Sequence, residues 1–415
     1  MSMRSIFVIL AISSLMLSGC HQADEPLPIS GNSDATTAIQ HLLDEKAQTG
    51  GEVVLPPGQY LIAGNLTVPE GVSLRGSWRA PHHGDAWQKG TTFLLTKGRG
   101  NEKGSAAISL EEDSSLEGVT LLWPEQMAND IQPYPWAVEG QGKHMTVENV
   151  TLVNAYQGIS TGTHDGSLHL IRNIYGCVLR RGILVDATSD IGRIENVHFN
   201  THYWLGSGHP SSRAGDGDKV VDFVRDNLEA FIFARSDWEY VFDTFVWDAK
   251  AAYHFVKSEH GACNGQFLGI GADYAKTCVQ IDDIQPIGLQ ITNGEFTAFA
   301  GDPNSTIVTA PGAGGAAQFV NCNFWGTKNH VAWMQGDTTI TLANCHILDT
   351  FAGGAVLAER GKLIIQGCTF DQAGPTAVLK KDVKAAVIFG NLQPGGVQIQ
   401  NEIGPRAQIG LNEMP

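Results

Sequence analysis

The chain has 415 residues, of which 42% are hydrophobic and 48 are glycine, and its formal net charge at pH 7 is −16. This composition allows a large core, and abundant glycine without low complexity is typical of folds with many tight turns, such as all-β or solenoid folds. The acidic balance argues against nucleic acid and anionic lipid as partners, because both need a basic surface. A neutral partner fits better, while a uronate polymer stays open because four arginines could form a local basic patch: Arg172, Arg180, Arg181 and Arg193.

The first twenty residues are typical of a bacterial export signal. A basic start at Arg4 precedes an apolar stretch over residues 6–17 that is too short to cross a bilayer. Leu17-Ser18-Gly19-Cys20 resembles the bacterial lipobox, and this resemblance implies cleavage before Cys20 and lipid attachment to its sulfur. We therefore predict a signal peptide over residues 1–19, a tether over 20–32 and one folded domain over 33–415. The protein would be exported and held at the outer membrane or cell surface through the lipid anchor only.

An amphipathic helix is predicted at the start of the folded domain, over about residues 36–48. Ser33 or Asp34 can cap its first turn, and Gly50-Gly51 end it. Its apolar face carries Ala38, Ile39, Leu42 and Leu43. An open solenoid exposes its terminal core, so we expect this helix to cover that end. Short strands broken by turn pairs follow over residues 52–76.

A four-residue unit then recurs along the chain: a turn residue, a small or β-branched residue, a variable residue and a large apolar residue. It returns every roughly 20 to 31 residues, with one gap about twice as long, and this is the size of one solenoid coil. The turn residues are Gly118, Asn149, Gly176, Asn196, Asp243, Asn264, Asn293, Asn321, Asn344 and Gly367.

The repeat has a direct physical reading. Asn, Gly and Asp tolerate the left-handed backbone that a sharp bend between short strands requires. The second and fourth residues of the unit then point inward and stack from coil to coil. Cys322, Cys345 and Cys368 follow one another by steps of 23 residues, so we expect them to stack inside as free thiols. No Cys and His spacing resembles a zinc site. The predicted fold is all-β, a single-stranded right-handed parallel β-helix.

Residues 34–76 resemble the amino-terminal segment of the pectate lyase superfamily, and the following coils are similar to the β-helix of that superfamily. The resemblance covers nearly all of the mature chain. It implies an action on polysaccharides, although the group includes lyases, glycoside hydrolases, epimerases and phage tailspikes. The Asn-Thr-Asp and Gly-His-Gly triplets of its polygalacturonase branch are absent here.

The resemblance implies that the strand after a variable turn lines the substrate groove. The doubled gap places a long loop over residues 201–219 at such a turn. Long loops on a rigid scaffold often carry function. His202, Tyr203 and Trp204 open this loop and are predicted to stack on sugar rings.

Two aspartates precede the groove strand in consecutive coils, Asp248 and Asp273. Adjacent coils stack about 4.8 Å apart, so the two carboxylates are predicted to be neighbours that act as acid and base or nucleophile. The alternative is that both are turn residues that bond backbone amides. His254 would point outward and serve as a base or hydrogen-bond donor.

A second acidic and aromatic cluster consists of Asp237, Trp238 and Glu239, with Arg235 before it. Its carboxylates, two residues apart on one strand face, are predicted to bind sugar. Calcium is the alternative ligand, although nothing fixes the six or more oxygen atoms that it needs. Lys250 and Arg235 are the cations that a uronate lyase would use.

These observations predict an extracytoplasmic enzyme that cleaves glycosidic bonds, a hydrolase using Asp248 and Asp273. A polysaccharide lyase or C5 epimerase acting on uronates is the first alternative, and a non-catalytic glycan-binding surface protein is the second. We expect a polysaccharide or oligosaccharide as partner and no cofactor, with calcium required only if the protein is a lyase.

Overall fold

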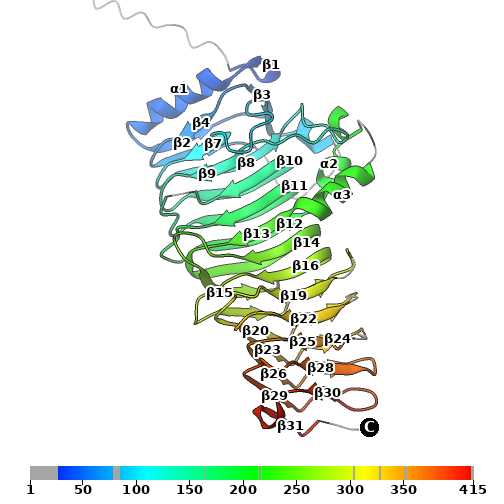
Figure 1. The fold of residues 1–415 in the computed structure, drawn as a ribbon. Coiled ribbons are helices and arrows are strands. Elements are labelled where there is room, and N and C mark those ends of the chain that lie inside the picture. The colour runs from blue at the N-terminus through cyan, green and yellow to red at the C-terminus, as the bar shows by residue number, and fades with distance from the viewer. Residues whose placement is uncertain are drawn as a thin grey trace, which may run out of the picture.

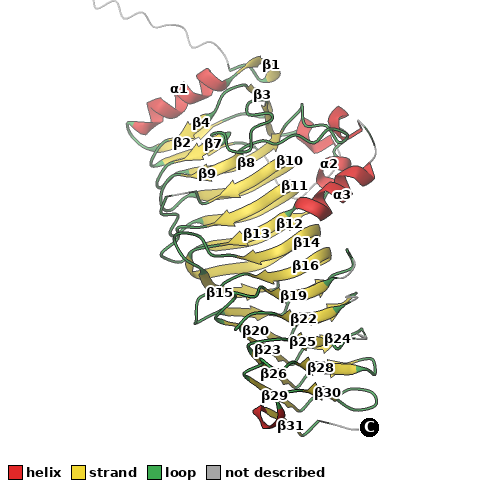
Figure 2. Ribbon diagram, viewed as in Figure 1, coloured by secondary structure: helices red, strands yellow, loops and turns green. Residues whose placement is uncertain are grey.

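The computed structural model describes residues 27–77, 85–162, 164–213, 215, 217–301, 304–326, 329–349 and 353–412. In this part of the chain, 31 strands join into one continuous sheet with parallel pairing between successive coils. The sheet winds into an elongated solenoid, as Figures 1 and 2 show. The predicted parallel β-helix is confirmed. The predicted signal peptide and Cys20 lie outside the described residues.

Each coil contributes to three faces. The first face is built from β2 (Gly51–Val54), β5 (Val72–Arg75), β15 (Cys263–Leu268), β17 (Leu289–Thr292), β20 (Ala316–Val320), β23 (Thr339–Ala343), β26 (Lys362–Gln366), β29 (Ala385–Phe389) and β31 (Ala407–Gly410). The second face holds β1 (Ser30–Asp34), β3 (Gly58–Ile62), β6 (Thr91–Leu95), β18 (Glu295–Thr297), β21 (Asn323–Trp325), β24 (His346–Ile347) and β27 (Thr369–Phe370). The third face holds β4 (Leu66–Val68), β7 (Ile108–Leu110), β9 (Trp136–Gly140), β13 (Glu229–Phe233), β19 (Ser305–Thr309), β22 (His330–Met334), β25 (Val356–Ala358), β28 (Pro375–Leu379) and β30 (Gln398–Asn401).

Six long strands bend from one face to the next and so connect the faces. These are β8 (Ser115–Leu122), β10 (Thr146–Ser160), β11 (Leu170–Val185), β12 (Arg193–Phe199), β14 (Ser236–Phe255) and β16 (Gly271–Ile281). Their pairings with neighbouring coils change face at the turn residues.

A column of left-handed residues separates the first face from the second. Its members have φ between 51° and 66°: Gly118, Asn149, Asn173, Asn196, Asp243, Gly269, Asn293, Asn321, Asn344 and Gly367. Within the column, Asn196 Nδ2 donates to Asn173 Oδ1 at 2.8 Å, and Asn173 donates in the same way to Asn149 at 3.1 Å. The sequence-derived column is therefore right at eight of its ten positions.

The two wrong positions are Gly176 and Asn264, because the turns lie at Asn173 and Gly269 instead. Gly176 sits within β11, where a Cβ atom would lie 2.2 Å from the carbonyl oxygen of Leu152. Glycine is needed there because two strands approach closely. In the sequence, such a glycine cannot be distinguished from a glycine that makes a turn.

The interior is apolar and includes the predicted cysteine stack. Cys322, Cys345 and Cys368 are at most 2% exposed, and every cysteine in the described ranges is buried and free. Asn321 and Asn344 occupy the left-handed turns that precede two of them. The predicted register of these coils is confirmed.

The amino-terminal helix α1 (Thr36–Ala47) lies across the first coils, as Figure 1 shows. Ile39 and Leu43 have no exposed surface. The N-cap residue is Ala35, which has no side-chain bond to the helix, while Asp34 Oδ1 accepts the Thr36 N–H at 2.9 Å.

The predicted loop over residues 201–219 is in part helical. It contains α2 (His202–Leu205), η2 (Pro210–Arg213) and the start of α3 (Gly217–Asn227), which packs against the solenoid through Val220 and Val224. Two further 3₁₀ turns are η1 (Asp85–Gln88) and η3 (Gly404–Arg406). None of the helices within the described ranges has the length and hydropathy of a membrane span.

Candidate active site

Asp248 and Asp273 are not brought together. Asp273 pairs with Trp247 and Ala275 pairs with Ala249, so Asp248 lies opposite Tyr274, one residue out of register. Asp248 and Tyr274 are left-handed turn residues with φ of 68° and 60°, and Asp248 is buried against Arg225 whereas Asp273 lines an open hollow, so the two side chains lie in different surroundings. The predicted catalytic pair is therefore corrected: a single-residue offset in the turn separates its members.

Asp248 is fully buried and pairs with a helix instead. Its Oδ1 lies 3.2 Å from Nε of Arg225, and its Oδ2 accepts a hydrogen bond from Arg225 Nη2 at 3.3 Å. Burial raises the pKa of Asp248 to about 7, although the Arg225 charge opposes this shift. The pair fastens α3 to β14, so Asp248 has a structural contact in place of the predicted solvent-facing role.

Asp273 lines a hollow of about 490 Å³ on the second face. The lining of the hollow also includes Asp243, Phe245, Glu295 and Trp325. Gly271 lies between Phe245 and Glu295 in neighbouring coils, and its missing side chain leaves the hollow open. A Cβ atom at Gly271 would lie 3.0 Å from the Phe245 ring.

The charge of one carboxylate in this hollow, Glu295, affects the pKa of the other, Asp273. Burial and the charge of Glu295 raise the pKa of Asp273, against a backbone hydrogen bond from Tyr274. Glu295 Oε1 accepts a hydrogen bond from Trp325 Nε1 at 3.2 Å. Because Glu295 pairs with Gly271, it lies one coil and two residues from Asp273, a backbone separation of about 8 Å for strands about 4.8 Å apart that rise about 3.3 Å per residue.

Glu295 was missed by the sequence reasoning, which treated it only as the variable residue of a repeat unit. That position points outward on the second face in each coil, because the residues before and after it point inward. Phe245 and Asn323 occupy the same position in other coils. Comparing this column of outward residues could have found the site.

A row of partly exposed rings runs along the second face beside the carboxylates. We call it the aromatic stripe, and it consists of His202, Trp247, Tyr274, Phe299 and Trp325. Successive ring centroids are 5.9, 6.0, 6.1 and 5.4 Å apart. Partly exposed aromatic rings suit contact with sugars, because one part of each ring is packed and another meets solvent.

Of the three aromatic residues predicted to open the loop, only His202 contributes to this stripe. Tyr203 is 4% exposed and Trp204 has no exposed surface, and the Trp204 indole donates to Ser211 Oγ at 3.1 Å. These two rings fix α2 and η2 to each other and to the solenoid. The expected sugar stacking by Tyr203 and Trp204 is therefore corrected, since their faces are covered.

His254 does point outward from the third face, between the buried Tyr253 and Phe255. Its Nε2 lies 2.8 Å from Asp282 Oδ2, and its Nδ1 lies 3.7 Å from Glu229 Oε2. Burial lowers the pKa of His254, but these two carboxylates outweigh burial and raise it to about 9. At neutral pH the ring is protonated, so it can donate a hydrogen bond or a proton but cannot act as the predicted base.

Lys250 belongs to the same charged network, with Nζ 3.5 Å from Glu229 Oε1. Glu229 is ionised because the ion pair with His254 lowers its pKa to about 2, against the opposing effect of burial. The network joins β13, β14 and the residues after β16 across three coils. It places Lys250 and His254 together, but on a different face from Asp273.

Asp237 and Glu239 do not share a face. Trp238, between them, has φ of 62°, and this left-handed residue breaks the strand alternation on which the prediction depended. Glu239 is fully buried and pairs with His169 at 3.0 Å, so the expected sugar contact by Glu239 is corrected. Asp237 pairs with Arg235 and accepts from Gln285 Nε2 at 2.6 Å. Arg235 also lines a separate hollow of about 300 Å³.

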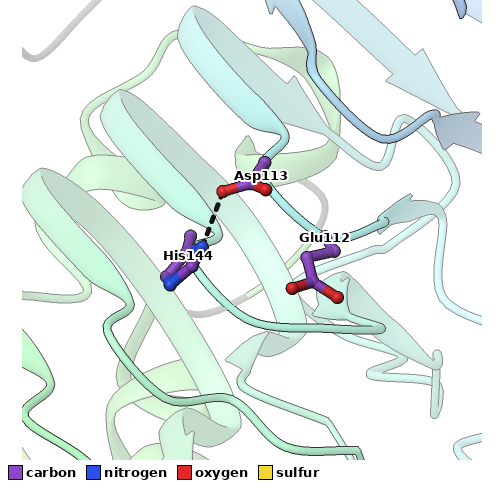
Figure 3. A group of neighbouring side chains, drawn as sticks. All are labelled: Glu112, Asp113 and His144. Atoms are coloured by element: carbon purple, nitrogen blue, oxygen red, sulfur yellow. Dashed lines mark hydrogen bonds and ion pairs between the residues drawn. The ribbon is translucent and has the colours of Figure 1, made fainter.

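One cluster of possible metal ligands lies on turns of adjacent coils. The ligand atoms of Glu112, Asp113 and His144 lie within 4.8 Å of one another, and Figure 3 shows His144 bonded to Asp113. The distance from His144 Nδ1 to Asp113 Oδ1 is 2.6 Å. Three ligands are fewer than the six or more oxygen atoms that calcium takes, so we assign no metal to this cluster.

Comparison with known proteins gives the same fold. Residues 27–116 match the model of the Rhamnogalacturonase A/epimerase, pectate lyase-like family. The catalytic domain of a GH87 alpha-1,3-glucanase in complex with tetrasaccharides is similar over 92% of this chain and 67% of that chain, with 12% identity and a TM-score of 0.53. The A-module of the mannuronan C-5 epimerase AlgE6 from Azotobacter vinelandii covers 93% of this chain and 97% of its own, with 13% identity and a TM-score of 0.43.

A surface adhesin of Streptococcus pneumoniae, PfbA, is similar over 92% of this chain and 90% of its own, with 14% identity and a TM-score of 0.39. No curated protein is significantly similar in sequence. The expected resemblance is confirmed: the amino-terminal segment matches a pectate lyase-like family model, and the chain as a whole shares the parallel β-helix fold with the GH87 catalytic domain.

Proposed function

We propose that the protein is a glycoside hydrolase that cleaves a polysaccharide in the hollow on the second face. The observation that carries the proposal is the pair of carboxylates Asp273 and Glu295 beside the rings of Phe245 and Trp325. Two carboxylates, one with a raised pKa, are the usual machinery for hydrolysing a glycosidic bond.

In the proposed reaction Asp273 is the general acid, because burial and the charge of Glu295 raise its pKa and so favour the protonated form that a general acid needs. Glu295 is the base that takes a proton from water as its oxygen attacks the anomeric carbon. The separation of the two carboxyl groups sets the stereochemical outcome: about 6.5 to 9.5 Å gives inversion and about 5 to 5.5 Å gives retention. The glycosidic C–O bond breaks as the bond to the water oxygen forms; Asp273 ends without its proton and Glu295 ends with one, and proton exchange with solvent restores both groups.

A lyase is less well supported at this position. Elimination from a uronate needs a cation to neutralise the sugar carboxylate, and no Lys or Arg is among the described residues that line the hollow. The earlier candidates Lys250 and Arg235 lie elsewhere, each paired with a carboxylate. No cofactor enters the proposed reaction.

The test is product analysis on a panel of polysaccharides with purified protein. New reducing ends without ultraviolet absorbance support a hydrolase, whereas unsaturated ends that absorb in the ultraviolet support a lyase. Binding without any product, in the presence of intact Asp273 and Glu295, would favour a non-catalytic glycan-binding protein.

We also propose that the protein is exported and lipid-anchored at the outer membrane or cell surface. The lipobox-like stretch that ends at Cys20 supports this location. A polysaccharide substrate outside the cytoplasm is consistent with this location.

A further inference from the structure

We infer that the hollow binds a chain of uncharged sugars running along the solenoid axis, with Trp247 and Trp325 as contacts on either side of Asp273. This inference rests on the proposed function only for the place where the chain is cut. It names a substrate class and an orientation, and it excludes polyuronates.

The charge of the hollow argues for uncharged sugars. Asp243 and Glu295 supply two carboxylates beside Asp273, the proposed acid, and the described lining contains neither Lys nor Arg. A bound uronate would place its carboxylate within a few ångströms of these like charges, with no described cation in the lining to offset the repulsion, and this costs free energy at low salt. Arg225 stacks over Tyr274 of the stripe at 4.8 Å and is already paired with Asp248 and Asp222.

The position of the rings argues for the orientation. Trp247 pairs with Asp273 in the next coil, and Trp325 pairs with Thr297. Because Glu295 pairs with Gly271, Thr297 continues the row of Asp273. Trp247 and Trp325 therefore stand three coils apart on one row, about 14 Å at about 4.8 Å per coil, with Asp273 between them.

A sugar chain that follows this row would contact both rings while one linkage lies over the carboxylates. A chain running across the coils would meet only one ring. Trp247 stacks between His202 and Tyr274, beside the hollow, so the edge of its ring is the part that meets a sugar. The bond from Trp325 to Glu295 ties the second ring to the reacting carboxylate.

The experiment measures binding in the full-length Asp273→Asn protein, so that substrate is not consumed. Calorimetry would compare hexasaccharides of neutral α-glucan, β-glucan and mannan with hexagalacturonate and hexamannuronate at low salt. We expect at least one neutral hexasaccharide to bind and neither uronate to bind more tightly. Trp247→Ala and Trp325→Ala should each weaken that binding about tenfold, the effect of losing about 1.4 kcal/mol of ring contact.

Two controls sharpen the result. Trp325→Phe keeps a ring and should retain most of the affinity. Trp333→Ala removes a partly buried ring from the third face and should leave the affinity unchanged. Tighter binding of a uronate, no binding of any neutral hexasaccharide, or unaltered affinity in both second-face variants would overturn the inference. Cleavage of a polyuronate that depends on Asp273 would overturn this inference and would still support the proposed hydrolase. Binding of a neutral hexasaccharide without cleavage by the parent protein would support the inference and contradict the hydrolase.

Discussion

Trp325 donates its indole N–H to Glu295 at 3.2 Å across neighbouring coils of the second face. The bond holds a partly exposed ring and a carboxylate in one fixed relation at the edge of the hollow. It needs both residues to project outward from β18 and β21. The tryptophan thus orients the carboxylate that we propose to activate water.

The carboxylates of the hollow should be required for turnover. Asp273→Asn and Glu295→Gln are each expected to lower kcat by about 10²- to 10⁴-fold, the usual contribution of a general acid or base. Both side chains are partly exposed, so the melting temperature should hardly change. Polarimetry on the parent protein should show which anomer forms, and therefore whether the two carboxyl groups work at the inverting or the retaining distance.

Asp248→Asn is the matched control for this prediction, because Asp248 is buried against Arg225 and outside the hollow. It should keep near-normal turnover below its melting temperature. In the parent, kcat/KM should fall as pH rises through the pKa of Asp273, since the acid must be protonated. Near-normal activity of Asp273→Asn would move the site to the third-face network of Glu229, His254 and Asp282.

Asp248 should make stability depend on pH. Its pKa is about 7 in the folded protein, above the ordinary value of 3.8, so the folded state binds its proton more tightly. The stability linked to this proton is fully present below about pH 4 and is lost as pH rises through about 7. Urea titrations should show the parent losing stability relative to Asp248→Asn across this window. Parallel curves for the two proteins would contradict the assignment.

The buried pair of His169 and Glu239 should be needed for stability. Both side chains are fully buried, and the Glu239 carboxylate raises the pKa of His169 against the opposing effect of burial. His169→Ala leaves a buried charge without its partner, which costs about 3 to 5 kcal/mol in urea denaturation. Because the folded pKa is raised, this contribution is present below the unfolded pKa and is lost as pH rises through the folded one.

A surface pair of the same kind provides the comparison. His144 bonds Asp113 at 2.6 Å, but their side chains are 39% and 54% exposed. His144→Ala should therefore cost no more than about 1 kcal/mol. Equal losses in the two histidine variants would show that burial does not set the strength of the His169 pair.

A charged side chain in the cysteine stack should destabilise the folded protein. Cys345→Asp places a carboxylate where the thiol is 2% exposed, and an unpaired buried charge costs several kcal/mol. We expect the chain to unfold or to melt far lower, whereas Cys345→Ala should give a much smaller loss. Circular dichroism melting distinguishes the two, and unchanged melting of the Asp variant would show the register to be wrong.

Anchoring should depend on Cys20. Cys20→Ser is expected to abolish labelling by a radioactive fatty acid and to move the protein from the membrane fraction to the soluble fraction. The fold should stay intact, because the described β-helix starts after this residue. Equal membrane association of the two forms would refute the lipid anchor.

The repeat of turn residues and inward apolar residues was enough to predict the solenoid. Asn321 and Asn344 could be placed because only a few residue types tolerate φ near +55°, and their neighbours Cys322 and Cys345 follow from strand alternation. This information is local, and it is repeated once per coil, so an error in one coil does not spoil the rest. Gly176 shows the limit, since glycine also serves close strand contact.

The site depended on information that is not local. Asp273 shares the hollow with Glu295 rather than with Asp248 because Asp248 stands at a left-handed turn, one residue out of register with Asp273. Likewise, the left-handed Trp238 turned Glu239 inward to His169, seventy residues away in sequence. The sequence by itself determined the β-helix and its turn columns, because backbone preference and burial act within each coil. Only the tertiary structure decided which carboxylates and rings meet, because that depends on how one coil sits on the next.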